Sequence, residues 1–238
     1  MNLEGKTALI TGGSKGIGYG IAQAMLEQGM KVAITSRTQA GADTAVDELK
    51  KIGKGEILGF ASDVRSFESQ QVVADELMNL WGGIDVVIAN AGLGHFGSVE
   101  DITPEQWQET VGVNLTGAFY ALKSTIPALK KSKGYYITIS SLAGTNFFAG
   151  GSAYNASKFG LTGFTQAAML DLRQYGIKMT TIMPGSVATY FNNHTPNDAD
   201  AWKIQIEDLG QMVIDLLKMH PRTLPSKIEV RPTTPPSR

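Results

Sequence analysis

The chain has 238 residues with a formal net charge of −1, and 42% of its residues are hydrophobic and 18% charged. This composition supplies a large core and gives no indication of a nucleic-acid or membrane partner. Without any cysteine, the chain has no disulfide, no thiolate metal site and no cysteine nucleophile, and its sequence presents no other cluster of metal ligands.

The N-terminus and the hydropathy of the chain indicate where in the cell the protein is expected. The segment MNLEGKTALITGG has a short apolar run that reaches glycine at once, unlike a signal peptide. No stretch approaches the roughly 20 apolar residues of a membrane-spanning helix. We expect a cytoplasmic protein with a single domain over residues 1–238, a length typical of one large α/β unit. Its Pro-rich tail, residues 231–238, is expected to fray.

Strand and helix patterns alternate along the whole chain. Apolar, β-rich runs predict strands at 7–10, 31–35, 56–60, 84–89, 135–140, 177–183 and 228–230. Helical patterns lie at 17–28, 40–51, 66–81, 104–131, 152–175 and 207–219. Continuously apolar strands are typical of a sheet that is covered on both faces. The order predicts an α/β fold with a single doubly wound parallel sheet of about seven strands, a Rossmann fold.

Two of these helices carry finer predictions. The helix at 104–131 is expected to break near Gly112 or Thr116 and to bend or end at Pro127. The helix at 66–81 is amphipathic. Its residues expected to face inward are Val72, Val73, Leu77 and Leu80.

Three side chains near the middle of the chain suggest catalysis. Tyr154 and Lys158 are four residues apart, so in a helix they leave the same face one turn apart. A free tyrosine titrates near ~10, and a nearby cation lowers this pKa. Ser141 ends an apolar strand and can present its hydroxyl across a pocket. Such a group can bind and protonate a carbonyl oxygen, although a Tyr-x-x-x-Lys pair alone is common in ordinary helices.

A glycine-rich segment, TGGSKGIG at residues 11–18, joins the first strand to the first helix. Its glycines allow a tight turn, and free N–H groups at the helix start can face a pyrophosphate. Glycines also make ordinary turns. Here they lie at the first turn between strand and helix, which is where a nucleotide site requires them. The candidate cofactor residues of the segment are Gly12, Ser14, Lys15, Gly16, Ile17 and Gly18.

The motifs together resemble those of the short-chain dehydrogenase/reductase family. The glycine spacing is G-x-x-x-G-x-G, and the resemblance covers about residues 5–220. The matching motifs are TGGSKGIG, NAG at 90–92, Asn114 in VNLTGAF, Ser141, Tyr154-x-x-x-Lys158 and PGSVAT at 184–189. The resemblance implies a Rossmann fold, a nicotinamide cofactor that carries hydride, and a carbonyl or alcohol substrate.

The resemblance also implies a role for each matched residue. Tyr154 exchanges a proton with the substrate carbonyl, Ser141 holds the carbonyl oxygen, and Lys158 lowers the pKa of Tyr154 and binds the nicotinamide ribose. Asn114 holds a water that links Lys158 to solvent, unless it is only a helix-bending amide.

Further cofactor contacts are implied around these residues. Asn90, Ala91 and Gly92 pass the adenine-side ribose and steady the central strand. Val187 and Thr189 contact the carboxamide and phosphate, although Pro184 and Gly185 alone would also fit a turn that ends a strand. Asp63 and Val64 are implied as neighbours of the adenine.

Charge at the end of the second strand predicts NADP(H) as the cofactor. NAD sites usually place an acidic residue there to accept from the ribose 2′-hydroxyl. This chain instead has Ser36 and Arg37, with Lys15 in the glycine segment. Two cations without an anion favour a 2′-phosphate, and an arginine fork suits it. The alternative is that both cations are ordinary solvated surface charges.

The substrate pocket is predicted to be mostly apolar and aromatic. Residues 190–206 are expected to form a substrate loop, with a mobile stretch at 192–201. Any of the candidate lining residues could equally be packing residues, and His95 is expected to line the pocket rather than to act as the acid. The candidates are His95, Phe96, Leu142, Phe147, Phe148 and Phe191.

The leading functional hypothesis is an NADPH-dependent carbonyl reductase. Within the family, 3-oxoacyl-[acyl-carrier-protein] reductase is one candidate, and Lys130, Lys131 and Arg173 could meet an acidic carrier. Against it, Tyr175 stands where a basic residue is frequent, and the C-terminus LPSKIEVRPTTPPSR lacks a glycine-rich end. The alternatives are a reductase or dehydrogenase of a small free ketone, hydroxy acid or sugar, and a non-catalytic NADP-binding sensor.

The resemblance further implies a homodimer or homotetramer joined by the helices at 104–131 and 152–175. The small residues that would allow close helix contact are Ala153, Ala156, Ala167 and Ala168. Packing against the sheet explains these alanines equally well. The sequence leaves open the substrate, the stereochemistry of the alcohol and the physiological direction.

Overall fold

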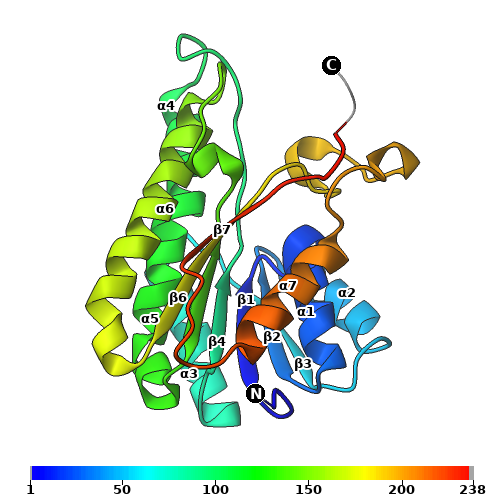
Figure 1. Ribbon diagram of the computed structural model, residues 1–238, viewed down its shortest axis with the longest axis vertical. Coiled ribbons are helices and arrows are strands. Elements are labelled where there is room, and N and C mark those ends of the chain that lie inside the picture. The colour runs from blue at the N-terminus through cyan, green and yellow to red at the C-terminus, as the bar shows by residue number, and fades with distance from the viewer. Residues whose placement is uncertain (1, 236–238) are drawn as a thin grey trace.

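The computed structural model describes residues 2–235, and all of its strands form one parallel sheet (Figure 1). The strands are β1 (Thr7–Thr11), β2 (Lys31–Ser36), β3 (Ile57–Ala61), β4 (Val86–Ala89), β5 (Tyr135–Ile139), β6 (Lys178–Pro184) and β7 (Lys227–Val230). Their spatial order is β3-β2-β1-β4-β5-β6-β7. The predicted doubly wound parallel sheet of seven strands is confirmed.

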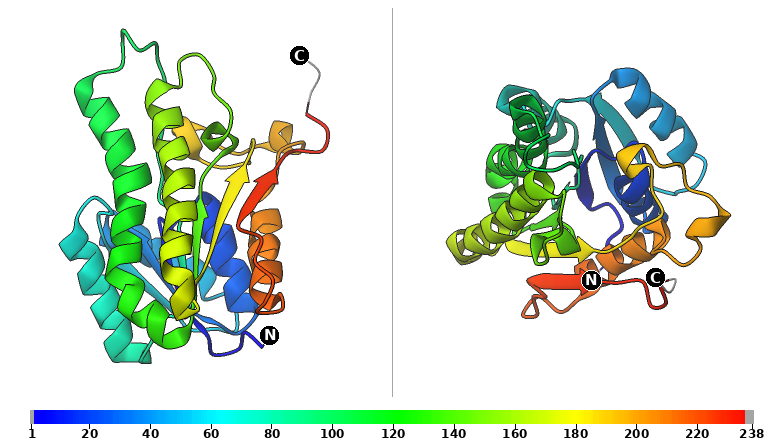
Figure 2. Two further views of the ribbon diagram at one scale, coloured as in Figure 1. Left: turned by 60° about the vertical axis from the view of Figure 1, so that its left-hand side comes forward. Right: turned by 90° about the horizontal axis from the view of Figure 1, so that it is seen from above.

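Helices cover both faces of this sheet (Figure 2). One face carries α1 (Gly16–Glu27), α2 (Gln39–Leu49) and α7 (Ile206–Lys218), and the other carries α3 (Phe67–Trp81), α5 (Gly117–Ser132) and α6 (Ser152–Leu172). The shorter helix α4 (Pro104–Val111) precedes α5 and packs beside α6. Two hydrophobic layers result, one on each side of the strands.

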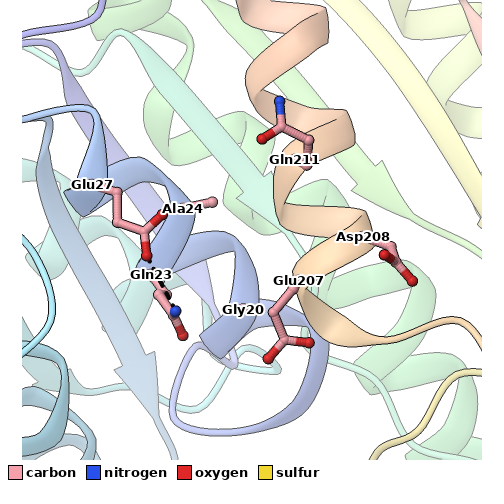
Figure 3. Close-up of a pocket in the computed structure, with 7 residues that line it drawn as sticks. All are labelled: Gly20, Gln23, Ala24, Glu27, Glu207, Asp208 and Gln211. Atoms are coloured by element: carbon pink, nitrogen blue, oxygen red, sulfur yellow. Dashed lines mark hydrogen bonds between the residues drawn. The ribbon is translucent and has the colours of Figure 1, made fainter. Parts of the chain in front are cut away.

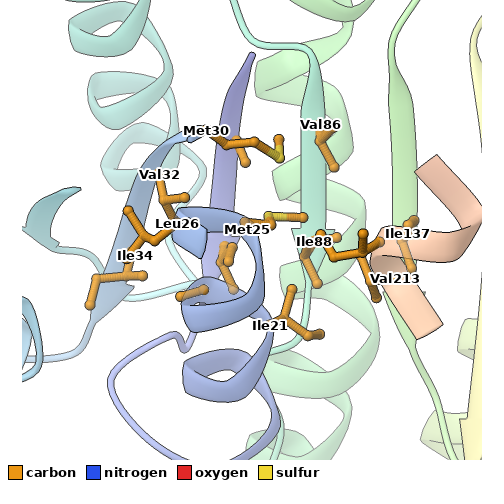
Figure 4. Close-up of a cluster of buried hydrophobic side chains, with 14 of the residues drawn as sticks. Ile21, Met25, Leu26, Met30, Val32, Ile34, Val86, Ile88, Ile137 and Val213 are labelled. Carbon is orange, nitrogen blue, oxygen red and sulfur yellow. The ribbon is translucent and has the colours of Figure 1, made fainter. Parts of the chain in front are cut away.

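The layer under α1 and α7 shows how the chain forms its core (Figure 4). Ile21 and Met25 of α1 lie one turn apart and are fully buried against the strands, as is Ile88 of β4. Complete burial of such a side chain stabilises the fold by about 1.5–3 kcal/mol. The central strands are buried on both faces, which explains why the sequence shows continuous apolar runs instead of alternation.

Helix α3 corrects one prediction from the sequence. Val73 and Leu77 are buried as expected, but Val72 is 68% and Leu80 54% exposed. Only one sector of the helix faces the sheet, and Val73 and Leu77 occupy its centre. The buried polar residue of this sector is Gln70, whose Nε2 donates to the main-chain oxygens of Val64 at 2.6 Å and Gly117 at 3.0 Å.

The predicted long helix at 104–131 is interrupted where the sequence suggested. A π-helical turn at Gly112–Thr116 separates α4 from α5. Pro127 lies inside α5 and does not end it, because the helix continues to Ser132. The π turn is therefore the real interruption, and it carries Asn114.

The remaining segments partly depart from expectation. Residues 190–206 contain two short 3-10 turns, at Phe191–Asn193 and Asp198–Asp200, rather than an irregular loop. In the tail, Arg231 pairs with Glu229 at 3.0 Å, whereas residues 236–238 of the predicted frayed end lie outside the described residues. Within residues 2–235, no helix has the length and apolarity needed to cross a bilayer.

Candidate active site

The candidate site lies at the carboxyl ends of β1 and β4. These strands pair in parallel, with Thr11 opposite Ala89, and the sheet order reverses direction between them. Open α/β sheets bind ligands in the crevice at such a switch point. The glycine segment follows β1 and the NAG segment follows β4, so the topology brings both predicted cofactor motifs together.

Two glycines of the first turn fit too tightly for any side chain. Gly12 has φ 63°, and a Cβ there would lie 2.9 Å from Cα of Ala91. A Cβ on Gly18 would lie 2.5 Å from Nδ2 of Asn90 and 2.7 Å from the main-chain oxygen of Gly12. The two glycines therefore allow the turn to close upon the NAG segment.

Asn90 holds this turn from the neighbouring strand. Its Nδ2 donates to the main-chain oxygens of Thr11 at 3.0 Å and Gly12 at 2.9 Å. Thr11 Oγ1 in turn accepts from the N–H groups of Asn90 at 3.1 Å and Ala91 at 3.2 Å. The sequence prediction missed Thr11, although it is the first residue of the glycine motif.

Replacing Gly18 by alanine tests the role of this close contact. We expect Gly18→Ala to push Asn90 away from the glycine turn, to destabilise the protein by about 1–3 kcal/mol, and to weaken dinucleotide binding by about tenfold or more. Urea unfolding and titration of cofactor fluorescence measure the two effects. Gly83→Ala is the matched control, because a Cβ at Gly83 meets no atom within 4 Å. Unchanged binding in Gly18→Ala would contradict the assigned role.

The start of α1 fits a phosphate. Lys15 is the N-cap residue and supplies no side-chain cap, so the first N–H groups of the helix keep their donors for an anion. The exposed Lys15 places its Nζ 5.9 Å from the ring centroid of Tyr190. Ser14 Oγ donates to Ser36 Oγ at 3.4 Å, which joins the glycine segment to the end of β2. Gly16 and Ile17 form the first turn of α1.

Asp63 and Val64, the predicted neighbours of the adenine, make contacts with other residues of the chain. The Asp63 carboxylate pairs with Arg65 at 2.7 Å, and the hydrogen bond from Arg65 is the main cause that lowers the pKa of Asp63. Arg37 is close enough to lower this pKa further. Val64 is buried, and its Cγ2 lies 2.9 Å from where a Cβ of Gly117 would be. Val64 therefore packs against the start of α5.

The predicted catalytic groups converge at the start of α6. Tyr154 lies in the first turn of this helix, and Lys158 Nζ is 5.7 Å from the centroid of its ring. Ser141 follows β5, and its hydroxyl lowers the pKa of the Tyr154 phenol. Ser141 Oγ also accepts from the N–H of Ala143 at 3.1 Å, which fixes its rotamer.

The electrostatics of these groups differ from the sequence prediction. Burial raises the pKa of Tyr154, and the hydrogen bond with Ser141 only opposes that shift. Lys158 was expected to lower this pKa, but its Nζ donates to the main-chain oxygen of Ile139 at 3.0 Å instead. Lys158 is only 4% exposed, and burial lowers its own pKa from 10.5 to about 8. The phenol is therefore held in its protonated, acid form.

The buried ammonium predicts a pH-dependent stability. Because the folded pKa of Lys158 lies below the unfolded value, its charge destabilises the protein fully below about pH 8, and this cost disappears as the pH rises to 10.5. We expect Lys158→Met to stabilise the dinucleotide-free protein by about 2 kcal/mol at pH 7, after loss of its hydrogen bond, and not at all near pH 11. Urea unfolding at both pH values measures this.

Lys51→Met is the control, since Lys51 is exposed. An equal gain in both variants would show that burial of the Lys158 charge is not the cause.

Asn114 is the centre of a buried polar network. Its Nδ2 donates to the main-chain oxygen of Leu93 at 2.8 Å and to Ser157 Oγ at 2.9 Å, and its Oδ1 accepts from the N–H of Leu93 at 2.9 Å. Ser157 Oγ donates to the main-chain oxygen of Tyr154 at 2.8 Å. Asn114 thus ties the NAG segment to the catalytic helix. Its predicted role in holding a water stays a prediction.

Two further contacts connect the NAG segment and the catalytic helix to their surroundings. A Cβ on Gly92 would meet Oδ1 of Asn114 at 3.4 Å and Nζ of Lys158 at 3.6 Å, so this glycine lies directly beside the catalytic lysine. Asn155, which the prediction missed, donates from Nδ2 to the main-chain oxygens of Ala143 at 2.8 Å and Asn146 at 2.7 Å. Asn155 thereby supports the segment after Ser141.

Aromatic rings surround Tyr154 on the substrate side. Its ring centroid lies 5.3 Å from that of Phe96 and 5.6 Å from that of Phe191. Phe96 also contacts Phe148 and Phe191, with centroid separations of 6.1 Å and 6.2 Å. The three phenylalanines come from three separate segments, and the fold brings their rings together beside the phenol.

The other pocket candidates behave differently. His95 Nε2 forms a hydrogen bond of 2.8 Å with Oε2 of Glu109, which lies on α4. Phe147 is 86% exposed and lies in the segment before α6. Leu142 lies beside Gly185, with Cδ1 3.1 Å from where a Cβ of Gly185 would be.

The segment after β6 closes the other side of the site. Pro184 ends the strand, and the N–H of Gly185 donates to the main-chain oxygen of Val230 at 2.8 Å. Val187 forms a parallel bridge with Ile204. Thr189 is buried, and its Cβ lies 3.5 Å from the position of a Cβ on Gly16. The segment therefore contacts the glycine turn, as a cofactor-binding role requires.

One groove of the surface lies away from the candidate site. It has a volume of about 330 Å³ and runs between α1 and α7 (Figure 3). Its polar lining consists of carboxylates and amides, namely Gln23, Glu27, Glu207, Asp208 and Gln211. It contains none of the predicted catalytic or cofactor residues.

Comparison with known proteins agrees with this geometry. A family model described as "short chain dehydrogenase" matches residues 6–200. The chain belongs to the short-chain dehydrogenase family. As a short-chain dehydrogenase, it is an oxidoreductase acting on CH–OH or carbonyl groups.

The short-chain dehydrogenase is similar to two named relatives and to one solved structure. It is 35% identical to the D-beta-hydroxybutyrate dehydrogenase of Cupriavidus necator over 189 residues, 79% of this chain and 72% of that protein. It is 35% identical over 190 residues to the 3-oxoacyl-[acyl-carrier-protein] reductase FabG of Vibrio cholerae, 79% of this chain and 76% of that protein. An alcohol dehydrogenase from Thermococcus sibiricus, complexed with 5-hydroxy-NADP, has a TM-score of 0.92 and 26% identity, with 99% and 100% of the chains covered.

Proposed function

We propose that this short-chain dehydrogenase reduces a ketone to a secondary alcohol and uses NADP(H). The observation that carries the proposal is the convergence of Ser141, Tyr154 and Lys158 beside the glycine turn. Burial raises the pKa of Tyr154, so the phenol carries the proton that reduction of a ketone requires.

The chain's own residues account for the acid chemistry. A bound nicotinamide supplies the hydride. The Ser141 hydroxyl and the Tyr154 phenol both donate hydrogen bonds to the carbonyl oxygen, and Tyr154 releases its proton to that oxygen as negative charge develops. Lys158, whose Nζ lies 3.6 Å from where a Cβ of Gly92 would be, would hold the ribose of the nicotinamide. Asn114, through Ser157, keeps the first turn of α6 in place during this step.

The glycine turn and the end of β2 would hold the dinucleotide. The uncapped N-terminus of α1 supports the pyrophosphate, and Arg37 supports a 2′-phosphate. Arg65 is committed to Asp63, whereas Arg37 forms no ion pair with any of residues 2–235. The NADP analogue named for the Thermococcus enzyme agrees with this choice.

The proposed function is tested by steady-state kinetics with both nicotinamide cofactors and a panel of ketones. The apolar wall of Phe96, Phe148 and Phe191 supports a ketone with an apolar substituent. Oxidation of NADPH by at least one such ketone, faster than oxidation of NADH, is the expected result. Binding of NADPH without turnover of any ketone, thioester, sugar or hydroxy acid would indicate the non-catalytic sensor instead.

A 3-oxoacyl thioester is the second candidate substrate, favoured by the similarity to the Vibrio reductase. Within one chain, the cations suggested for a carrier cannot flank the pocket. Arg173 follows the C-terminal end of α6, roughly 28 Å along the helix from Tyr154. Lys131 donates to Gly82, and Lys130 lies 3.6 Å from the ring of Tyr175. Activity with acetoacetyl thioesters against matched free ketones separates the two candidates.

We further propose that two copies associate through α5 and α6. Phe119 is 44% exposed and lines a hollow of about 190 Å³ between these helices, together with Ile126 and Phe164. Of the alanines suggested for this contact, Ala153 and Ala168 are buried in the core, while Ala156 and Ala167 are exposed. We expect Phe119→Asp to shift the mass measured by light scattering toward the monomer. An unchanged mass would exclude this face.

A further inference from the structure

A buried carboxylate with two basic partners lies inside the segment that connects β6 to α7. Asp200 is 4% exposed, and its Oδ2 meets His194 Nε2 at 2.5 Å. Its Oδ1 meets Lys203 Nζ at 2.5 Å. We call His194, Asp200 and Lys203 the Asp200 clamp. In Figure 1 the segment is drawn in gold, above α1 and α7.

The clamp is held as one unit. A buried carboxylate is costly unless cations and donors surround it, and removal of one partner leaves the other charge unpaired. Hydrogen bonds from His194 first, and then from Lys203, lower the pKa of Asp200 to about 2. Gln205 Nε2 donates to the main-chain oxygens of Asp200 at 3.1 Å and Lys203 at 2.8 Å, which ties the clamp to the start of α7.

The clamp lies at one end of a tight reversal that carries Phe191. Asn192 and Asn193 have φ values of 56° and 59°, in the left-handed region that asparagine tolerates better than most residues. The N–H of His194 donates to the main-chain oxygen of Phe191 at 3.3 Å. The position of His194 therefore fixes the position of Phe191, whose ring stands against Tyr154.

The other polar contact that holds Phe191 is local, because its N–H donates to Oγ1 of Thr189 at 3.3 Å. The side chain of Phe191 is 38% exposed and that of the preceding Tyr190 is 50% exposed. The ring contacts of Phe191 are with Phe96 and Tyr154, which themselves line the site. Within residues 190–203, Asp200 is the only buried residue, so the Asp200 clamp is what ties this stretch to the interior.

We propose that Asp200, acting through His194 and Lys203, is a positioning residue that holds Phe191 over Tyr154 and thereby sets the affinity for the ketone. This inference rests on the proposed reductase function. It assigns a role in substrate binding to a side chain that touches neither the phenol nor the glycine turn. A purely structural role would change the stability of the protein without changing the affinity for substrate.

Hydrogen exchange of the full-length protein tests the clamp without relying on activity. Asp200→Asn keeps an acceptor for the N–H of Asn197 but removes the charge. We expect amides of residues 190–205 to exchange about tenfold faster in this variant, with those of β1 and β4 unchanged. Asp198→Asn is the matched control, because Asp198 lies in the same turn and is exposed. Equal exchange in both variants would overturn the proposal.

Kinetics provide the second measurement. For Asp200→Asn we expect KM for the ketone to rise about tenfold, and the Kd for NADPH, from fluorescence titration, to change less than about twofold. Faster exchange with an unchanged KM would also overturn the proposal. Should Asp200→Asn fail to fold, Lys203→Met carries the same two expectations. If the wild type reduces no carbonyl compound, the proposed function fails, whereas the exchange result still reports on the clamp.

Discussion

Tyr154→Phe is expected to lower kcat for ketone reduction by about 10²–10⁴-fold, because it removes the general acid. The variant keeps the aromatic ring, so the contacts with Phe96 and Phe191 remain. NADPH binding should therefore stay within about twofold of the wild type. Stopped-flow measurement of NADPH oxidation gives the rate, and fluorescence titration gives the affinity.

Tyr120→Phe serves as the control for this substitution. Tyr120 lies on α5, where its ring packs against Phe67 at a centroid separation of 5.7 Å. It loses the same hydroxyl group at a position outside the proposed site, and its activity should be unchanged. If Tyr154→Phe retained most of the wild-type rate, another group would have to supply the proton.

The double variant Ser36→Asp with Arg37→Ala is expected to move the cofactor preference from NADPH toward NADH by about 100-fold or more. The aspartate would accept from a ribose 2′-hydroxyl and repel a 2′-phosphate. Loss of Arg37 removes a charge-assisted hydrogen bond that contributes about 1.5–3 kcal/mol. The ratio of kcat/KM for the two cofactors measures the change.

The control for the cofactor variant removes an arginine elsewhere. Arg173 lies beyond the C-terminal end of α6, roughly 28 Å along the helix from Tyr154, and Arg173→Ala should leave the cofactor ratio unchanged. Equal use of NADPH and NADH by the wild type would contradict the charge argument itself. Arg37 would then be a solvated surface residue.

The residues around Tyr154 show what the sequence can predict about the site and what it cannot. Spacing alone places Tyr154 and Lys158 on one helix face, and the structure confirms their proximity. The expected effect of Lys158 on the pKa of Tyr154 is wrong, because the ammonium turns to the main-chain oxygen of Ile139. His95 was predicted to line the pocket, which stays a prediction, and the structure adds that Glu109 holds its ring. In both cases the partner of the side chain is distant in the sequence.

The Asp200 clamp is a second example of this limit. A polar stretch at 192–201 without an apolar period reads as a mobile loop. The structure instead buries one of its acids between His194 and Lys203 and forms two 3-10 turns. No local pattern distinguishes the buried Asp200 from the exposed Asp198, because burial depends on what the folded chain places over each.

The sequence by itself determined the alternation of strands and helices, the glycine turn and the helical spacing of the phenol and ammonium, since each depends on residues close together in the chain. Only the tertiary structure decided that Asn90 closes the turn on Gly12 from a strand 78 residues away, and that burial raises one pKa and lowers another. Local patterns encode the conformation of the backbone. Desolvation and long-range hydrogen bonds exist only after distant segments have packed together.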